Sequence, residues 1–513
     1  MLGEPRGSGV GTAIGSAIGT IALGFVLGAG QGCTASTLEH EACESDADCA
    51  ETVGGAHRCS SDGYCRVRAN PPARCEGDIH VRLLVDLTGP DAERGIPYFK
   101  GELDRIRQIN LEGGIRGCPI VAVAGDAQSD PATAREIHTG WLADPTWGDV
   151  VTVFSFSQGT VAELGADLAA GEVALVSART AGEHLAPGPL EVGADLVTVD
   201  ADFEFALSRG TRTSPGYPRS FSATSDDSTS GRLGMAFLAT QRPNKVGFVG
   251  CDDTECVAPL AATASQASVE QGLRIGRTLS LDSTADDAAV GAAVFAYFEE
   301  ELAQRAADPT YTPVDWVWVG TDARLAQASL AGLGRVRSEL GWPVRALVGY
   351  RAFDESLARG CAGDCSYMYG VSPVAAYDDD DEDLERLREI HDAWRADDAI
   401  GMDGNPAEVD DDGDPLAFHT MRYVHGSLSI LLWQRAVEHV VDFHQALDAP
   451  AIARALESDE PLELEGLTSP VALSAVDHRP QSSARVYRAR ADGTLGLVAE
   501  DVSLALQERW LGW

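Results

Sequence analysis

The sequence predicts an α/β protein whose parallel sheets are doubly wound, and two observations support this fold class. First, short apolar runs at 79–85, 119–124 and 150–154 alternate with segments that carry apolar residues at helical spacing. Parallel strands require helical crossovers of this kind. Second, each run ends in polar residues, and ligands bind beyond the carboxyl ends of strands in such sheets. These polar strand ends are Asp86–Pro90, Asp126–Ser129 and Ser155–Thr160.

The first helices have recognisable starts and stops. Five apolar residues recur three and four positions apart between Ile96 and Ile109, and the pattern stops at Gly113-Gly114. Asp130 is placed to cap the second helix, with Pro131 at its first position. A third helix is expected at 161–170, followed by a short strand at 173–177.

The rest of the chain repeats the alternation after an interruption. Residues 181–218 are rich in Gly and Pro and predict an insertion with little regular structure. Further strands are expected at 220–224, 245–250, 273–281, 316–320, 345–348 and 368–372. Further helices are expected at 251–271, 288–306, 323–340, 378–394 and 418–441.

Composition limits the class of partner. The 513 residues are enough for two or three domains, and the hydrophobic fraction of 44% suffices for large cores. With 79 acidic against 39 basic residues, the net charge is −40. This charge argues against nucleic acid, whose phosphates require a basic face. We interpret the acidity as an aid to solubility or an adaptation to salt rather than as the sign of a specific cationic partner.

The N-terminus has the features of an export signal. The apolar, Gly- and Ala-rich run Val10–Val26 follows Arg6 and precedes small residues that end at Cys33. This pattern is typical of a secretory signal with a lipid-attachment cysteine, so residues 1–33 are predicted as a signal peptide and Cys33 as the lipidation site. The alternative is an uncleaved membrane anchor, since glycines recur every four residues within the run.

The eleven cysteines also indicate an oxidising compartment. Four of them lie in a polar block that cannot build a core, so we predict two disulfides among them, with the pairing left open. This block is Cys43, Cys49, Cys59 and Cys65, and its spacing does not fit a zinc site. Cys75 and Cys118 precede adjacent parallel strands and could bridge. Cys251/Cys256 and Cys361/Cys365 are local pairs in loops.

Three motifs in register resemble one protein family. They are D-L-T-G-P-D-A-E-R-G from Asp86, I-N-L-E-G-G-I-R-G from Ile109 and D-A-Q-S-D-P-A-T-A from Asp126. Together they resemble the start of the type I periplasmic binding proteins, and most closely the branched-chain amino acid receptors of ABC transporters. The resemblance extends over residues 78–500.

The resemblance implies two doubly wound lobes joined by a hinge, preceded by a small disulfide-rich segment. The expected divisions are 1–33 for the signal, 34–75 for the Cys-rich segment and linker, 76–225 plus 373–475 for the first lobe, and 226–372 plus 476–513 for the second. Proteins of this kind close around a solute by hinge motion.

The resemblance also implies a ligand site. Ser157, Gln158, Gly159 and Thr160 match the family position that holds a ligand carboxylate, and Thr180, near Ser177, matches a second hydroxyl cluster. Asp226 matches an acidic position beside the hinge. Helix starts bind anions, so this chemistry is reasonable. The alternative is that Ser157, Thr160 and Asp226 only cap helices.

Three positions depart from the family pattern. Gly349-Tyr350-Arg351 places an arginine where a glutamate usually meets the ligand ammonium, Arg179 replaces a small residue, and Asp322 replaces an aromatic one. A buried unpaired charge is costly, so we hypothesise that the ligand is not simple leucine or valine and carries a second anionic or carbonyl group that meets Arg351. The alternative is that Arg351 points to solvent and pairs with Asp354 or Glu355.

These observations predict an exported, lipid-anchored protein on the periplasmic side of a bacterial envelope membrane. It would capture an amino acid or related carboxylate for an ABC transporter permease, without a cofactor or a metal. The alternative is an envelope lipoprotein of the same fold that senses a ligand or regulates a partner. The sequence has no nucleophile elbow, Walker loop or H-E-x-x-H motif, so we expect no enzyme activity.

Overall fold

The computed structural model divides the chain into a small N-terminal unit and a large unit. It describes residues 57–59, 65–67, 75, 77–147, 150–179, 182–185, 195–200, 203–207, 216–361, 365–379, 382–394, 418–457, 461–475, 478–480 and 483–504. In the small unit, β1 (His57–Cys59) pairs antiparallel with β2 (Cys65–Val67). Cys59 is disulfide-bonded. Cys33, Cys43 and Cys49 lie outside the described residues, so lipidation and the pairing within the cysteine block stay predictions.

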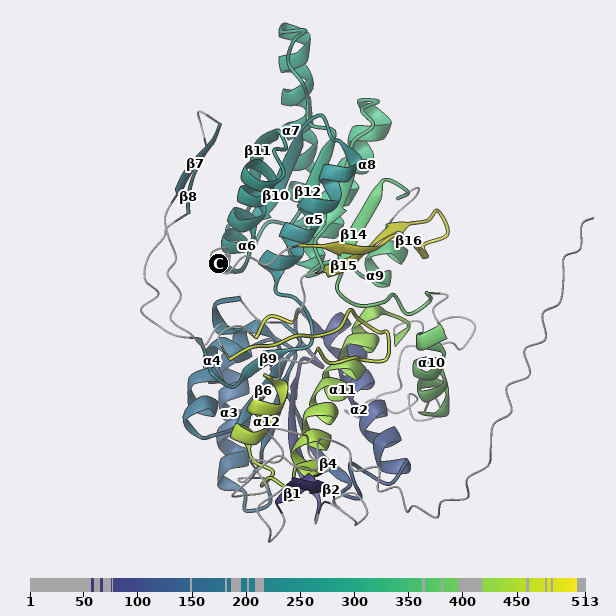
Figure 1. Ribbon diagram of the computed structural model, residues 1–513. Coiled ribbons are helices and arrows are strands. Elements are labelled where there is room, and N and C mark those ends of the chain that lie inside the picture. Colours follow the sequence, from purple (N-terminus) through teal and green to yellow (C-terminus); the bar gives the residue numbers. More distant parts are fainter. Residues whose placement is uncertain are drawn as a thin grey trace, which may run out of the picture. The chain divides into compact units, whose positions relative to one another are not determined.

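The first lobe of the large unit is built on a five-stranded, fully parallel sheet in the order β4-β3-β5-β6-β9 (Figure 1). Its strands are β3 (Ile79–Val85), β4 (Ile120–Asp126), β5 (Thr152–Ser155), β6 (Ala174–Ser177) and β9 (Ser220–Ser222). The crossover helices are α2 (Ala92–Leu111), α3 (Pro131–Ala143) and α4 (Gln158–Ala170). Asp130 caps α3 by accepting from the N–H groups of Ala132 and Thr133, as its position before Pro131 predicts.

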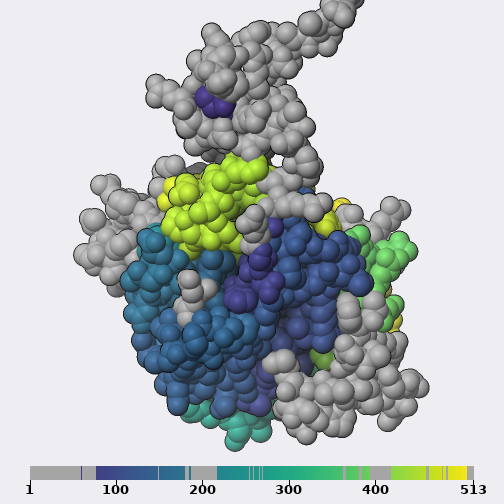
Figure 2. Space-filling model, turned by 90° about the horizontal axis from the view of Figure 1, so that it is seen from below, coloured from purple at the N-terminus to yellow at the C-terminus, as the bar shows by residue number. Residues whose placement is uncertain are grey.

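C-terminal helices complete the first lobe. They are α10 (Glu382–Trp394), α11 (Met421–Asp442) and α12 (Ala449–Leu456). Two glycines allow α2 and α11 to pack in backbone contact: a Cβ on Gly101 would lie 2.1 Å from the Tyr423 carbonyl oxygen, and one on Gly426 would lie 1.9 Å from that of Tyr98. In Figure 2 the yellow-green C-terminal segment accordingly lies against the blue N-terminal part of this lobe.

The second lobe is built on a seven-stranded mixed sheet in the order β11-β10-β12-β13-β14-β15-β16. Its strands are β10 (Val246–Cys251), β11 (Ile275–Leu281), β12 (Trp316–Val319), β13 (Arg345–Val348), β14 (Met368–Ser372), β15 (Ser483–Ala489) and β16 (Leu495–Ser503), of which the last two run antiparallel. Its helices are α5 (Asp227–Gln241), α6 (Thr254–Ser265), the π-helical turn η3 (Gln266–Glu270), α7 (Asp287–Ala307), α8 (Ala323–Glu339) and α9 (Glu355–Arg359).

The chain passes between the lobes three times, after β9, after β14 and before β15. The central strands β10, β12 and β13 are apolar runs because both faces of this parallel part of the sheet are covered; all four residues of β12, W-V-W-V, are buried. The α/β architecture with parallel sheets in two lobes, expected from the sequence, is confirmed.

The insertion differs from expectation. We expected little regular structure at 181–218, but this segment contains a 3-10 turn, η2 (Gly182–Leu185), and an antiparallel hairpin of β7 (Asp195–Asp200) and β8 (Phe203–Leu207). The sequences D-L-V-T-V-D and F-E-F-A-L contain the β-branched and aromatic residues that are typical of short strands, and the surrounding Gly and Pro residues predicted a loop instead.

The large unit contains three disulfides, between the pairs expected from the sequence: Cys75–Cys118, Cys251–Cys256 and Cys361–Cys365. Cys75–Cys118 ties together the chain before β3 and before β4, which are neighbours in the sheet. Within the described part of the chain, none of the helices is at once long enough and apolar enough to cross a membrane.

Candidate functional site

The carboxyl ends of the first-lobe strands carry the polar groups that the sequence indicated. After β4, Asp126 accepts hydrogen bonds from the N–H groups of Leu87 and Thr88 and from the Thr88 hydroxyl, so it fixes the turn that follows β3. Asp86 accepts from the Ser129 N–H and is 1% exposed. Burial raises the pKa of Asp86 to about 6.

The start of α4 presents two buried hydroxyl groups. Ser157 caps the helix by accepting from the Thr160 N–H at 3.2 Å, and its Oγ lies 3.0 Å from the Thr160 hydroxyl. Gln158 and Gly159 form the first turn between them. The capping role is therefore present in the structure. The same N-terminus has the positive end of the helix dipole and suits an anion.

Arg179 follows β6 and extends toward the second lobe. Its guanidinium lies 3.3 Å from the Asp91 carboxylate at the start of α2 and 3.8 Å from the Glu255 carboxylate of the second lobe. It also lies 6.0 Å from the centre of the Phe156 ring. Burial would lower the pKa of Arg179, but Asp91, Glu255 and Asp227 raise it, so the side chain stays charged. Thr180 lies outside the described residues.

The two acidic residues predicted in the second lobe serve as helix caps. Asp226 accepts from the N–H and the hydroxyl of Thr229 at the start of α5. Asp322 accepts from the Leu325 N–H at the start of α8. The structure therefore favours the capping alternative for Asp226, and it gives Asp322 a capping role that the sequence analysis did not consider.

Arg351 contradicts the alternative considered from sequence. It does not pair with Asp354 or Glu355 and is only 13% exposed; its partner is Glu255, at 2.6 Å. Asp354 pairs instead with Arg94, and Glu355 accepts from main-chain N–H groups. That alternative was wrong because the turn after β13 directs Asp354 and Glu355 into the interior, where both are buried.

Tyr350 makes a buried hydrogen bond between the lobes. Its side chain is buried, and its hydroxyl lies 2.8 Å from His425 Nδ1 in α11. The other ring nitrogen of His425 lies 3.2 Å from the Thr224 hydroxyl, near the first crossing between the lobes. Burial, with Arg422 nearby, lowers the pKa of His425 well below its ordinary value, so this histidine is neutral.

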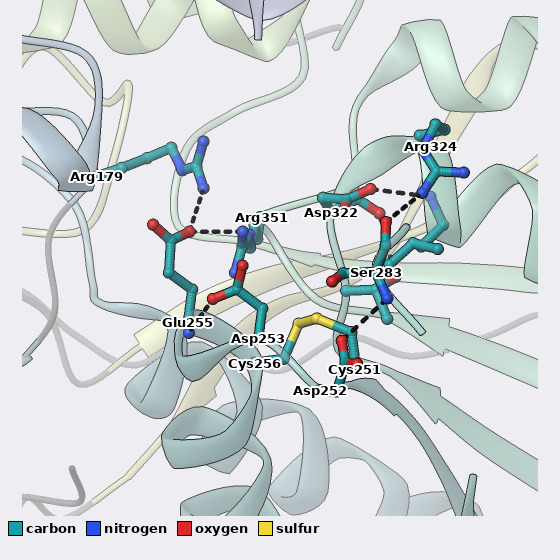
Figure 3. Close-up of a disulfide and its surroundings, with 12 residues drawn as sticks. Arg179, Cys251, Asp252, Asp253, Glu255, Cys256, Ser283, Asp322, Arg324 and Arg351 are labelled. Atoms are coloured by element: carbon teal, nitrogen blue, oxygen red, sulfur yellow. Dashed lines mark hydrogen bonds and ion pairs between the residues drawn. A yellow bond between two sulfur atoms is a disulfide. The ribbon is translucent and has the colours of Figure 1, made fainter. Parts of the chain in front are cut away.

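A small pocket opens in the second lobe beside Arg351. Part of its lining is apolar, from Trp318, Pro259 and Leu260. The charged lining consists of Asp227, Glu255 and Arg351. Figure 3 shows Arg179, Glu255 and Arg351 converging beside the Cys251–Cys256 disulfide.

Sequence reasoning missed Asp91, Asp227 and Glu255 as members of this cluster. The carboxylates considered as partners of Arg351 were Asp354 and Glu355, which follow β13 closely, in the segment where the resemblance implies a glutamate. The signal for Glu255 was the strand end C-D-D-T-E-C, which follows β10 as the other polar segments follow their strands. Among the residues that the structure describes, no cluster of metal-ligating side chains is found.

Comparison with known proteins identifies the family. A sequence model described as "Periplasmic binding protein" matches residues 78–494. The chain belongs to the periplasmic binding protein family. The resemblance noted in the sequence is thereby confirmed, and this family consists of solute-binding proteins rather than enzymes.

Solved structures of this family share the fold at low sequence identity. An ABC transporter substrate-binding protein from Aeropyrum pernix is 19% identical, with a TM-score of 0.62 over 85% of this chain and 99% of the other. A fatty acid ABC transporter substrate-binding protein from Thermomonospora curvata is 16% identical, with a TM-score of 0.60 over 87% and 96%.

A branched-chain amino acid ABC transporter protein from Thermus thermophilus, solved with valine, is 15% identical, with a TM-score of 0.61 over 84% and 98%. None of the curated proteins compared with this sequence matches it.

Proposed function

We propose that this protein is an exported receptor that captures a small carboxylate-bearing solute between its two lobes and delivers it to an ABC transporter permease. The observation that supports this proposal best is the meeting of Arg179 from the first lobe and Arg351 from the second at one carboxylate, Glu255. The first lobe supplies the α4 N-terminus, with the Ser157 and Thr160 hydroxyls, and Arg179. The second lobe supplies Arg351.

These groups suit a carboxylate. Hydroxyl and N–H donors at a helix start stabilise an anion, and a guanidinium binds a carboxylate through two parallel hydrogen bonds. The relatives support the same ligand class, because valine and a fatty acid, named for two of them, both carry a carboxyl group. The ABC transporter role likewise rests on the family and on these relatives.

Arg351, at the position where the resemblance implies a glutamate, restricts the class of ligand that we propose. A guanidinium in the place of a glutamate does not accept an α-ammonium, and its nearest carboxylate, Glu255, is already paired. The ligand therefore carries a second anionic or carbonyl group rather than the plain side chain of leucine or valine. Asp227, which lines the pocket and faces both arginines, is the carboxylate best placed to receive a cationic group if the ligand has one.

Export completes the proposal. The apolar run before Cys33 and the cysteine-rich block place the protein on the periplasmic side of an envelope membrane, with Cys33 acylated as the first mature residue. Mass spectrometry of the mature N-terminus tests this. A chain that begins at Met1, or a cleaved chain with unmodified Cys33, contradicts it. Peptide mapping should likewise find the disulfides of Cys43, Cys49, Cys59 and Cys65 within that block.

Native mass spectrometry of protein purified without added ligand tests the function. We expect a bound small molecule that carries at least one carboxyl group, retained by wild type and lost from Arg179→Ala. Arg335→Ala is the matched control, because Arg335 is an exposed arginine paired with Glu339 on the same helix. A released molecule without a carboxyl group, or one retained equally by Arg179→Ala, contradicts the proposal.

A further inference from the structure

Glu255 lies between two guanidinium groups that belong to different lobes. Its Oε2 atom is 2.6 Å from Arg351 Nη2 in the second lobe and 3.8 Å from Arg179 Nη2 in the first (Figure 3). One carboxylate oxygen thus serves both arginines. This contact links the lobes at the cleft where the proposed function places the ligand.

The three side chains differ in their access to solvent. Arg179 and Arg351 are 9% and 13% exposed, whereas Glu255 is 31% exposed. A guanidinium with so little exposure requires a counter-charge. Glu255 can instead turn into water, where its charge is solvated, while another carboxylate takes its place beside the arginines. Glu255 is therefore the member of the cluster that can leave.

The two arginines also retain unused donors. Nε and Nη1 of Arg351 and Nε of Arg179 are buried and have no acceptor among the described residues. Glu255 meets one nitrogen of each arginine through a single oxygen. A carboxylate seated between the two forks can accept from several of these nitrogens, as bidentate arginine–carboxylate pairs do. The pair is thus incompletely used by Glu255.

Two contacts fix the main chain at Glu255, whereas its side chain can rotate. The Cys251–Cys256 disulfide joins the end of β10 to the first turn of α6, and Asp253 caps that helix by accepting from the Glu255 N–H. The backbone position of Glu255 is therefore fixed from both sides. Only rotation about its side-chain bonds is needed to remove the carboxylate from the cleft.

We propose that Arg179 and Arg351 form a carboxylate-binding site, that Glu255 holds this site as an internal latch, and that a second carboxylate of the ligand replaces Glu255 when the ligand binds. The ligand class is then a dicarboxylate. This inference rests on the proposed function, because it concerns the same cleft.

The charges in this cluster favour a ligand carboxylate that replaces Glu255 over one that binds in addition to it. Asp86, Asp91 and Asp227 also act on Arg179, so with Glu255 there are four carboxyl groups around it, against the three guanidinium groups of Arg179, Arg351 and Arg94. A further anion added to this set meets net repulsion. A ligand carboxylate that replaces Glu255 leaves the buried charge unchanged, while Glu255 moves to water. A solute with an uncharged far end leaves Glu255 in place.

Small-angle X-ray scattering of refolded protein in buffer without solute tests the latch. We expect Glu255→Gln and Glu255→Ala to have a larger radius of gyration than wild type, because the contact between the lobes at the cleft is lost. Glu339→Gln is the matched control, since Glu339 pairs with Arg335 of the same helix and we expect its scattering to equal wild type. Scattering of Glu255→Gln that is superimposable on wild type overturns the latch.

Chemical rescue tests the carboxylate site without knowledge of the natural ligand. Sodium acetate should return the radius of gyration of Glu255→Ala toward wild type, and sodium chloride of equal ionic strength should not. Equal effects of the two salts overturn the assignment of Arg179 and Arg351 as a carboxylate site. Circular dichroism confirms that each variant is folded before it is compared.

These outcomes separate the inference from the proposed function. If native mass spectrometry finds a bound carboxylate but Glu255→Gln scatters as wild type, only the latch fails. If Glu255→Gln opens and acetate closes Glu255→Ala, but no carboxylate solute is found, only the transport proposal fails.

Discussion

Two clusters of the same composition join the lobes, and they differ in how completely they are satisfied. In each, one carboxylate lies between an arginine of the first lobe and a second arginine. Asp354 meets Arg94 at 2.8 Å and Arg422 at 3.3 Å, and its other oxygen accepts from the Leu357 N–H. The remaining bonds of the two arginines go to main-chain carbonyls, and Asp354 is 1% exposed.

The Glu255 cluster shows the opposite condition. Its carboxylate is 31% exposed, and three buried nitrogens of its two arginines have no acceptor among the described residues. A fully satisfied buried cluster fixes one geometry, whereas a partly satisfied one at a cleft is available for exchange. The comparison assigns Asp354 to holding the lobes together and Glu255 to the ligand site.

The largest expected effect is on stability. Asp354→Ala leaves two buried guanidinium groups without a carboxylate, and the loss of one partner from a buried pair costs about 3–5 kcal/mol. Glu255→Ala should cost less than Asp354→Ala, because Glu255 is 31% exposed and Arg179 keeps Asp91 as a partner. Chemical denaturation of the two variants measures both values. Equal costs would remove the distinction between the clusters.

The next effect is on ligand selectivity. We expect leucine, isoleucine and valine to bind far more weakly than a dicarboxylate, because none of them has a second anionic group for Arg351. Isothermal titration measures this, with Arg351→Ala compared with Arg335→Ala. Micromolar affinity for any of the three amino acids, undiminished in Arg351→Ala, rules out the assigned role of Arg351.

The next effect is the pH dependence of stability at the Asp354 cluster. Although burial would raise the pKa of Asp354, Arg94 and Arg422 hold it below its ordinary value. A carboxyl group with a depressed folded pKa stabilises the protein above its unfolded pKa, about 3.9, and loses that contribution as the pH falls through the folded value. Wild type should therefore lose more stability below about pH 4 than Asp354→Asn does. Parallel acid-unfolding curves would contradict this.

The smallest effect concerns two short disulfides. Cys251–Cys256 and Cys361–Cys365 close loops of similar length, with separations of 5 and 4 residues, so each adds about 2 kcal/mol or less. Replacement of both cysteines by serine should cost similar stability at either site. Only the loss of Cys251–Cys256 should also increase the radius of gyration, because this disulfide positions Glu255. An equal increase in the radius of gyration on loss of either disulfide would contradict a specific role of Cys251–Cys256 in positioning Glu255.

The fold was accessible from the sequence because its signals are local. Apolar runs, the Asp130-Pro131 helix start and short cysteine separations each involve neighbours along the chain. The candidate site was accessible only in part. Ser157 and Thr160 could be predicted because they follow the end of a strand, and the alternation of strands and helices predicts ligand-binding residues at strand ends.

The carboxylate partners of Arg351 and Arg94 could not be predicted from the sequence, because folding brings them together from distant parts of the chain. Arg351 and Glu255 are 96 residues apart, and Arg94 and Asp354 are 260 apart. No periodic pattern connects such pairs, so Arg351 was matched with carboxylates near it in the chain. Asp226 and Asp322 show the reverse, since their local role as caps was the informative one.

A crystal structure of the protein with the solute that co-purifies with it is the most direct test. The account predicts one carboxylate at the start of α4, near Ser157 and Thr160, and a second between Arg179 and Arg351, with Glu255 turned into solvent. A solute bound in the cleft while Glu255 still bridges the two arginines would contradict it.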